Sequence, residues 1–496
     1  MSQFKWVIAA LSASFAAVAS LDIPALSPRG AELLPQANYT ELAEQLSNTA
    51  SIYWPGSETF EDIVARWSNL SVPVANIVVV PGTEEDVVQI VNFANEHSAP
   101  FLATNGFHGS IATLGEMSDG IEIYLSQLNT VEISQDGKTA KIGGGIRARN
   151  LTDALWAAGK QTVTGACECV GYLGPGLGGG HGWLQGHHGL ISDQYLSFNV
   201  VLANGSLVTI DETSDLFWGM KGAGHNFGIV TSVTSKIYDL EYPNYAIDTI
   251  FFSGDKVEEV YQVSNELWIT NGTAPVGLNS WSYWYFDPTI DAEKEGVDIV
   301  DPIHTEPFHQ LGPIKNEPKS GDYRDLATWT GISLADGPCQ KTGNANPRFP
   351  IYLKSYNPQA QKQVYELFRE ATTGPNAHFA NSLFMFEGYS QQGVKAFPDD
   401  ASAFAYRSDN LLVAPLLIYS PGEELNQEAY KLGHQIRQVL FEGSGMTTMD
   451  TYVNYAYGDE TPANWYGSDS WRQERLAALK EKYDPDGKFS FYAPIA

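Results

Sequence analysis

Apolar positions in the first half of the chain form short strand-like runs and one clear helical stripe. The run Ile77–Val80 predicts a buried strand that ends at Pro81-Gly82. Thr83 and Asp86 then have the spacing of a helix-capping box. The residues that follow place one apolar face on that helix: Val87, Ile90, Val91 and Ala94. Phe101–Ala103 predicts the next strand, and because a helix joins the two strands we expect them to run parallel.

Further apolar runs predict strands separated by glycine-rich turns: 121–125, 130–134, 138–142, 198–203, 207–210 and 229–237. Leu151–Ala158 predicts a short helix that Gly159 ends. Residues 73–242 are therefore predicted to form one α+β domain. Residues 20–72 show little periodicity, and we expect an N-terminal segment that packs on this domain.

The pattern changes after Pro243. Aromatic or apolar runs predict further strands: 245–252, 280–286, 384–386 and 411–419. Apolar helical faces begin at Val257, Ala360 and Leu425. Residues 287–345, rich in Pro, Asp and Gly, predict a long loop-rich excursion. We expect a second domain over 243–447 and a C-terminal segment, 448–496, with a helix at Trp471–Lys482.

The N-terminus has the pattern of a secretory signal peptide over residues 1–19. Lys5 precedes the apolar run Trp6–Ala19, which closes on small residues and is too short to span a bilayer. A buried helix is the alternative reading. Five N-x-[ST] sequons agree with export and predict N-glycans: Asn38, Asn69, Asn150, Asn204 and Asn271. The predicted location is the secretory pathway.

Charge and cysteine content narrow the class of protein. Of the 496 residues, 58 are acidic and 29 basic, for a net charge of −29, which argues against nucleic acid and anionic membrane as partners. No other run is apolar enough to predict a membrane span. Three cysteines exclude a disulfide scaffold and leave at least one sulfur unpaired: Cys167, Cys169 and Cys339. No spacing predicts a metal site.

The stretch Gly165–Gly189 contains ten glycines in 25 residues. Glycine lets a backbone approach a ligand closely, and successive N–H groups in such a segment suit a pyrophosphate. The stretch lacks the usual nucleotide-binding signatures. Composition alone therefore leaves two readings, a cofactor cradle and a flexible loop.

Six segments of the chain together form a recognisable set: VVVPGTEEDVVQIVNFAN, TNGFHGS, CECVGYLGPGLGGGHG, DLFWGMKGAGHNFGIVTS, YVNYAYGD and RLAALKEKYDPDGKFS. They resemble the berberine-bridge-enzyme-like branch of the FAD-linked oxidases, related to vanillyl-alcohol oxidase, and are most like its fungal secreted members. The resemblance implies a two-part FAD-binding domain of the PCMH type over 73–242. It also implies a substrate domain, an antiparallel sheet covered by helices, and a C-terminal segment that returns to the FAD domain.

The same resemblance implies how FAD is held. His108 is expected to bond covalently to the flavin ring, with a second attachment at Cys167. Cys169 is then free or paired with Cys339, although Cys167 pairing with Cys339 or Cys169 is an open alternative. The other expected cofactor-binding residues are Asn105, Gly106, Gly109, Ser110, Val170, Gly171, Gly178, Gly179, Gly180, Gly182, Asn226, Gly228, Ile229 and Val230. Four histidines lie in or near these stretches: His181, His187, His188 and His225.

For catalysis, the resemblance implies that Tyr455 is the base. The alternative is that Tyr452 and Tyr455 are both aromatic residues of the core. A phenol titrates near pH 10, so the role of base needs neighbours that stabilise the phenolate. The glutamate base of plant relatives aligns near Val413 and is missing here, which leaves Glu387 as the nearest alternative acid. Val170 is expected to leave room for oxygen beside the flavin. The alternative is that valine stands here only for its backbone preference at the end of a strand.

The predicted function is a secreted FAD oxidase that takes hydride from an alcohol or activated C–H group and reduces oxygen to hydrogen peroxide. The aromatic run Trp281, Tyr283, Trp284, Tyr285 and Phe286 suits a planar natural product or stacked sugar rings. A tailoring step in secondary metabolism is favoured over a carbohydrate or small-alcohol oxidase. Two other classes stay open, a flavin-binding protein without turnover and a carbohydrate-binding protein without cofactor.

Overall fold

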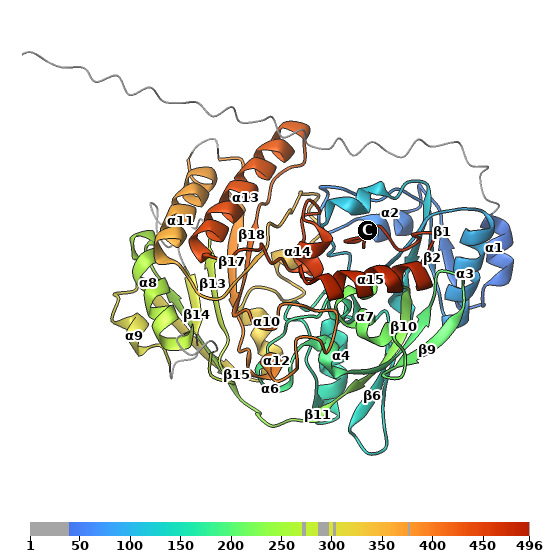
Figure 1. The fold of residues 1–496 in the computed structure, drawn as a ribbon, viewed down its shortest axis with the longest axis horizontal. Helices are drawn as coiled ribbons and strands as arrows, with labels where there is room; N and C mark the ends of the chain where they lie inside the picture. Colours follow the sequence, from blue (N-terminus) through green and yellow to red (C-terminus); the bar gives the residue numbers. More distant parts are fainter. Residues whose placement is uncertain (1–38, 270–273, 286–296, 301–303, 375–376, 496) are drawn as a thin grey trace, which may run out of the picture. The chain divides into compact units, whose positions relative to one another are not determined.

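The computed structural model describes residues 39–269, 274–285, 297–300, 304–374 and 377–495 (Figure 1). Four sequence predictions lie outside the described residues: the signal peptide at 1–19, the sequons at Asn38 and Asn271, and Phe286. Within the described part, helices and sheets are mixed throughout the chain.

A four-stranded sheet has the order β1 (Ser51–Tyr53), β2 (Ala75–Val80), β4 (Gly120–Tyr124) and β3 (Phe101–Thr104). β2 and β3 both pair in parallel with β4, which lies between them, so their predicted common direction is confirmed. The connecting helix α3 (Glu84–Glu96) begins with the predicted capping box of Thr83 and Asp86. Its apolar face packs on the sheet in one buried cluster.

The segment before this sheet contains more structure than its sequence predicted. It forms α1 (Tyr39–Gln45), β1 and α2 (Glu58–Val64), and β1 pairs antiparallel with β2. β1 is only three residues long, too short for an alternating pattern to stand out. Residues 39–64 thus extend the first sheet rather than only covering it.

A five-stranded sheet follows, antiparallel throughout, in the order β5 (Val131–Ile133), β6 (Thr139–Gly143), β10 (Ile229–Lys236), β8 (Tyr195–Val201) and β9 (Leu207–Asp211). The predicted strands and hairpins of this region are confirmed to within a few residues. α4 (Ala148–Ala157) confirms the predicted short helix and leads to β7 (Lys160–Gln161), which pairs with β11 (Tyr238–Asp239).

The glycine-rich stretch folds into α5 (Leu173–Leu177), α6 (Gln185–His188) and largely buried turns. Gly179 and Gly180 have φ of 100° and 84°, a backbone region that favours glycine. A Cβ at Gly182 would lie 2.0 Å from the carbonyl oxygen of Thr164. The stretch is therefore a packed part of the core and not an exposed loop. α7 (Leu216–Ala223) precedes β10.

The largest sheet has seven strands and is antiparallel. Its order is β15 (Lys315–Gly321), β12 (Tyr245–Phe251), β14 (Val297–Val300), β13 (Ser280–Trp284), β17 (Leu383–Gly388), β18 (Leu411–Leu416) and β16 (Ile351–Leu353). Three helices cover one face of it, α8 (Val257–Ser264), α11 (Pro358–Thr372) and α13 (Glu423–Ser444) (Figure 1). These elements confirm the predicted helical faces.

The expectation of a loop-rich excursion over 287–345 was wrong for the described residues of that range. They contribute β14 and β15 to the large sheet, together with α9 (Glu306–His309) and α10 (Leu326–Trp329). β15 is a mostly exposed edge strand of sequence KNEPKSG, so neither apolar alternation nor β-propensity marks it.

Alternation along β13 and β17 sends neighbouring side chains to opposite faces of the large sheet. Trp284, Phe384 and Phe386 pack under the helices. Trp281, Met385 and Glu387 instead line a cavity on the other face. The register of this sheet therefore decides which side chains reach the cavity.

α12 (Gln392–Lys395) lies between β17 and β18. After α13 the chain forms α14 (Pro462–Tyr466) and α15 (Ser470–Tyr483), and α15 confirms the predicted C-terminal helix. After α15 the segment runs back to the turn before β10, where the Ile495 amide donates to Asn226 Oδ1 (3.0 Å). Lys480 Nζ donates to the Asn226 carbonyl (3.1 Å).

Candidate active site

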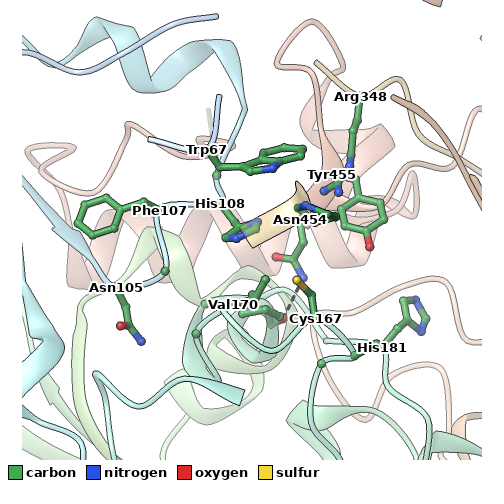
Figure 2. Close-up of a pocket in the computed structure, with 18 of the residues that line it drawn as sticks. Trp67, Asn105, Phe107, His108, Cys167, Val170, His181, Arg348, Asn454 and Tyr455 are labelled. Carbon is green, nitrogen blue, oxygen red and sulfur yellow. Dashed lines mark hydrogen bonds between the residues drawn. The ribbon is translucent and has the colours of Figure 1, made fainter. Parts of the chain in front are cut away.

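A cavity of about 610 Å³ is lined by the loop after β3, the start of the glycine-rich stretch, the open face of the seven-stranded sheet and the C-terminal segment. Twelve of the expected cofactor-binding and catalytic residues are on its wall: Asn105, Gly106, His108, Gly109, Cys167, Val170, Gly171, Gly228, Ile229, Val230, Glu387 and Tyr455. Residues far apart in the chain thus meet at one site, several of them visible in Figure 2.

The loop after β3 presents His108 to this cavity. Phe107 has φ of 59°, an uncommon value for a bulky residue that is found at functional sites. The Trp67 ring stacks on His108 with centroids 5.4 Å apart. Burial lowers the pKa of His108 to about 3, and the positive charges of Arg348 and Arg147 act in the same direction. The imidazole is therefore neutral at ordinary pH.

Cys167 is a free thiol, and the other two cysteines form a disulfide, Cys169–Cys339, across 170 residues. Cys169 is therefore paired with Cys339 and is not free, and Cys167 pairs with neither of them. Cys167 Sγ lies 3.6 Å and 3.7 Å from the two disulfide sulfurs. Burial raises the pKa of the Cys167 thiol to about 11.

Those nearly equal distances place the Cys167 sulfur beside the S–S bond rather than along its axis. Thiol–disulfide exchange proceeds by thiolate attack on one disulfide sulfur. Both the side-on position and the raised pKa of Cys167 therefore disfavour exchange and keep this thiol available.

Tyr455 and Glu387 form a hydrogen-bonded pair across the cavity. The Tyr455 hydroxyl donates to Glu387 Oε1 (2.9 Å), and the Tyr389 hydroxyl donates to Oε2 (2.8 Å). Burial raises the pKa of Glu387, and both hydroxyl hydrogen bonds oppose that shift. Burial raises the pKa of Tyr455 too, and the Glu387 charge raises it further. Tyr455 is therefore a neutral phenol directed at a carboxylate.

Val413, near which the glutamate of plant relatives is expected to align, lies in β18 and packs into the cluster under the helices. A side chain at this position points away from the cavity. Glu387, on the neighbouring β17 and in register with Leu412, is the carboxylate that reaches Tyr455.

Tyr452 has different partners from Tyr455. Its hydroxyl oxygen accepts from Asn454 Nδ2 (2.8 Å) and from the His181 amide (3.3 Å). His181 is held between Gln185 Oε1 and the Tyr352 hydroxyl, both 2.8 Å away. Burial lowers its pKa to about 4. This buried network fixes the wall of the cavity beside the glycine-rich stretch.

Six predicted cofactor residues lie off the cavity wall: Ser110, Gly178, Gly179, Gly180, Gly182 and Asn226. The four glycines are closely packed against other parts of the chain. Asn226 is fully buried and bonds the C-terminal segment through both ends of its amide. A role in holding the cofactor stays a prediction for these six residues.

Among the histidines, His181 and His225 line the cavity, whereas His187 and His188 do not. His225 bonds the Gly174 carbonyl through Nε2 (2.9 Å), and its Nδ1 is buried without a partner in the described chain. Within the same residues, one group has metal-ligand spacing, His108 with Cys167 and Cys169, but the Cys169 sulfur belongs to the disulfide.

Sequence reasoning missed several residues of the wall. Arg66, Trp67 and Arg348 lie near His108, and Lys488 and Phe489 come from the C-terminal segment. Trp67 and Arg66 stand in the segment without periodicity, and Arg348 stands in a loop. No local pattern of the sequence marks these positions as part of a site.

The polar groups of the cavity fit FAD. The amide N–H groups of residues 106–109 have no acceptor among the described residues, which suits an anion such as a diphosphate. Asn105 Oδ1 and His225 Nδ1 are buried and unpaired, a costly state that a polar ligand relieves. A Cβ at Gly106 would lie 2.8 Å from the Gly171 amide nitrogen, so the two cofactor-facing loops meet only because this residue is glycine.

The fold and the cavity together define a flavin-dependent oxidoreductase of the PCMH type. Residues 75–211 match the family described as "FAD binding domain", and residues 451–496 match "Berberine and berberine like". No helix among the described residues combines the length and apolar character needed to cross a membrane.

Relatives cover nearly the whole chain. The FAD-linked oxidoreductase chyH of Penicillium rubens is 58% identical over 470 residues, which cover 93% of this chain and 94% of the relative. The FAD-linked oxidoreductase chry5 of Gibberella zeae is 53% identical over 481 residues, covering 92% and 95%. The chain therefore belongs to the berberine-bridge-enzyme-like family of FAD-linked oxidoreductases.

Solved structures share the fold. The Physcomitrella patens BBE-like 1 protein superposes with a TM-score of 0.77 at 20% identity, over 92% of this chain and 98% of that one. The xylooligosaccharide oxidase from Myceliophthora thermophila C1 has a TM-score of 0.76 at 21% identity, over 92% and 98%. The expected fold is thus confirmed, an α+β FAD-binding domain with an antiparallel-sheet domain covered by helices.

Proposed function

We propose that this protein is a secreted oxidase that removes a hydride from an alcohol or activated C–H group of a small organic molecule and reduces oxygen to hydrogen peroxide. One observation carries the proposal: the attachment residues His108 and Cys167 share a cavity with the hydrogen-bonded pair Tyr455 and Glu387. The relatives named FAD-linked oxidoreductase support the redox class.

His108 and Cys167 are proposed to hold FAD through two covalent bonds. Their reactive atoms lie within 4.8 Å of each other, close enough to reach one edge of a flat ring. Neutral His108 offers a nitrogen lone pair, and Cys167 is the one sulfur left outside the disulfide. FAD held there would supply the hydride acceptor and the redox centre for the reaction with oxygen.

Tyr455 and Glu387 are proposed to remove the proton. The phenol oxygen of Tyr455 accepts the substrate hydroxyl proton while its own proton moves to Glu387 Oε1, 2.9 Å away. This relay avoids a free phenolate, which burial and the Glu387 charge both disfavour. Tyr389 stays bonded to the second carboxylate oxygen and holds Glu387 in place.

Covalent attachment is tested by acid precipitation and peptide mapping. The wild-type protein should stay yellow after denaturation, and one flavin-bearing peptide pair should contain both His108 and Cys167. His108→Ala and Cys167→Ser should each keep one bond, and the double variant should release its flavin. Flavin released by acid from the wild type would contradict the proposal.

The aromatic part of the wall favours a planar natural product as substrate. Trp281, Tyr283 and Tyr389 line the cavity, and Trp281 stacks on Trp183 with centroids 4.1 Å apart. Carbohydrate oxidation is the second candidate, because solved structures with this fold include an oxidase in complex with xylobiose. A screen of aromatic alcohols and oligosaccharides with a peroxide readout separates the two. No peroxide with any substrate would instead favour a flavin-binding protein without turnover.

Export is proposed to bring N-glycans to exposed sequons. Asn150 and Asn204 are exposed. Asn69 is only partly exposed, and its Nδ2 donates to the Gly343 carbonyl (3.3 Å). Peptide mapping of the secreted protein after enzymatic deglycosylation should therefore find higher occupancy at Asn150 and Asn204 than at Asn69. A leader peptide still present on the secreted chain would contradict cleavage near residue 19.

A further inference from the structure

Arg348 enters the cavity from a segment whose backbone is held at several points. The Ala345 amide donates to the Tyr419 carbonyl (2.8 Å), the Asn346 amide to Ser68 Oγ (3.0 Å) and the Phe349 amide to the Pro415 carbonyl (3.1 Å). These bonds tie the segment to β18 and the residues that follow it on one side and to the loop between α2 and β2 on the other. The position of Arg348 is therefore set by the fold and not by a free loop.

The Arg348 guanidinium lies against two aromatic rings of the cavity. Its centre is 4.1 Å from the Tyr455 ring centroid and 4.7 Å from the Trp67 ring centroid (Figure 2). Such contacts hold a guanidinium by its flat face and leave its N–H edge free to donate. The Nε–H of Arg348 is buried and has no acceptor among the described residues.

The charge of Arg348, a partly buried side chain, lacks the close carboxylate partner that buried arginines of this protein have. Arg66, Arg407 and Arg437 each pair with a carboxylate. Arg348 has no carboxylate oxygen within 4.0 Å in the described chain, although acidic residues outnumber basic ones two to one. The charge of Arg348 lowers the pKa of Glu387 across the cavity, but no ion pair within 4.0 Å joins the two described side chains, and both Glu387 oxygens accept hydroxyl hydrogen bonds.

We propose that Arg348 is a substrate-binding residue that recognises a carboxylate group, so that the oxidised molecule is an organic acid. A carboxylate presents two oxygens in one plane and matches the guanidinium fork, whereas a sugar hydroxyl does not. Leu416, whose backbone pairs with that of Arg348, and Met385 line the same cavity, and an apolar wall strengthens such a pair by excluding water.

The place of Arg348 also fits the chemistry. Its guanidinium contacts the ring of Tyr455, whose hydroxyl donates to Glu387. A carboxylate bound there would stand close to the carbon that loses its hydride. This inference rests on the proposed function and narrows its substrate class to aromatic or unsaturated acids.

The test compares two ligands of the same shape and different charge on the purified holoprotein. Benzoate and benzamide are titrated by calorimetry, which needs no turnover. Wild-type protein should bind benzoate more tightly than benzamide. Arg348→Gln should lower the benzoate-to-benzamide affinity ratio by about 10- to 100-fold, the range of a charge-assisted hydrogen-bonded pair. Arg348→Lys should keep part of the preference, since it retains the charge but not the fork.

Lys341→Gln is the matched control. Lys341 lies near the same loop, with Nζ 4.7 Å from the Phe107 ring centroid, but not on the cavity wall. Lys341→Gln removes one positive charge, as Arg348→Gln does. It should leave the ratio of benzoate to benzamide affinity within about twofold of the wild-type value, because a surface charge contributes little. A wild-type protein without benzoate preference overturns the inference, as does a preference that survives Arg348→Gln.

Two further results would reassign Arg348. A changed flavin potential with an unchanged benzoate preference would assign the residue to the cofactor. A shifted pH profile of flavin reduction with an unchanged preference would assign it to Glu387. Both outcomes overturn substrate recognition. A protein without flavin would contradict the proposed function instead, while calorimetry would still report the ligand preference.

Discussion

At the scale of residues, Glu387 and Tyr455 act as a pair whose properties neither side chain has alone. Tyr455 has almost no phenolate available to act as a base, because burial and the neighbouring carboxylate raise its pKa. Glu387 is 1% exposed, and its carboxylate accepts hydrogen bonds from two tyrosine hydroxyls. Resemblance pointed to Tyr455 as the base with Glu387 as a substitute, whereas their hydrogen bond favours a relay that needs both.

Both members of the pair should be required for reduction of the flavin. Tyr455→Phe and Glu387→Gln should retain FAD but slow anaerobic flavin reduction by about 10²- to 10⁴-fold, the usual range for a general base. Because burial raises the pKa of Glu387, the wild-type rate should fall at acid pH with a midpoint above the ordinary value near 4.3. Glu387→Gln should abolish this limb. Stopped-flow absorbance measures the rates, and an unchanged rate in Tyr455→Phe would return that residue to the aromatic core.

Val170 is predicted to control the access of oxygen. It lies on the cavity wall, and the Gly106 backbone approaches its Cα closely. Because packing there is tight, one added methylene matters. Val170→Leu should slow reoxidation by oxygen while flavin reduction by substrate stays nearly unchanged, and Val170→Ala serves as the control of opposite size. Equal oxygen rates in all three proteins would mean that Val170 is only a packing residue.

At the scale of elements, a buried side-chain amide in the turn before β10 helps to hold the C-terminal segment. Asn226 Oδ1 accepts from the Ile495 amide, and Nδ2 donates to the Tyr466 hydroxyl and the Ala493 carbonyl. Since the same segment brings Lys488 and Phe489 to the cavity wall, this attachment also shapes the site.

Asn226→Ala should loosen this segment. Its loss leaves buried donors and acceptors unpaired, which should destabilise the protein by about 2–4 kcal/mol. Thermal unfolding measures the loss, and limited proteolysis should cut the C-terminal segment sooner. Asn129→Ala is the control, because Asn129 makes a single exposed bond to the Ser126 carbonyl. An Asn226→Ala protein as stable as Asn129→Ala would show that the segment is held by its apolar contacts alone.

At the scale of the whole molecule, the excess of acidic residues includes one that is buried and costly. Asp409 is 3% exposed, and neither carboxylate oxygen has a hydrogen-bond partner among the described residues. Burial raises its pKa to about 7, and Asp450 adds to the shift while Lys354 and Lys395 oppose it. Protonated Asp409 therefore stabilises the folded state. This contribution is fully present below the pKa of the unfolded chain, near 3.8, and is lost as the pH rises through the folded-state pKa of about 7.

Asp409→Asn should therefore flatten the pH dependence of stability. Wild-type stability should fall between pH 4 and pH 8 by up to about 4 kcal/mol more than that of the variant. Urea unfolding at several pH values measures the difference. The exposed Asp119→Asn is the control and should follow the wild type. Parallel curves for Asp409→Asn and wild type would show that Asp409 is already ionised in the folded protein at low pH.

Local patterns of the sequence determined much of this protein. Capping boxes, helical stripes and glycine turns depend on neighbouring residues, so the helices and most strands were predictable. The family resemblance of short motifs singled out His108, Cys167 and Tyr455 as candidates, and the three line one cavity. β15 was not predictable, because an exposed polar edge strand has no apolar pattern. The tertiary structure alone decided which sulfurs pair, which face of β17 carries Glu387 and that Trp67 and Arg348 join the cavity. Those outcomes depend on contacts between residues 40 or more positions apart, which strand register and packing create and no local pattern encodes.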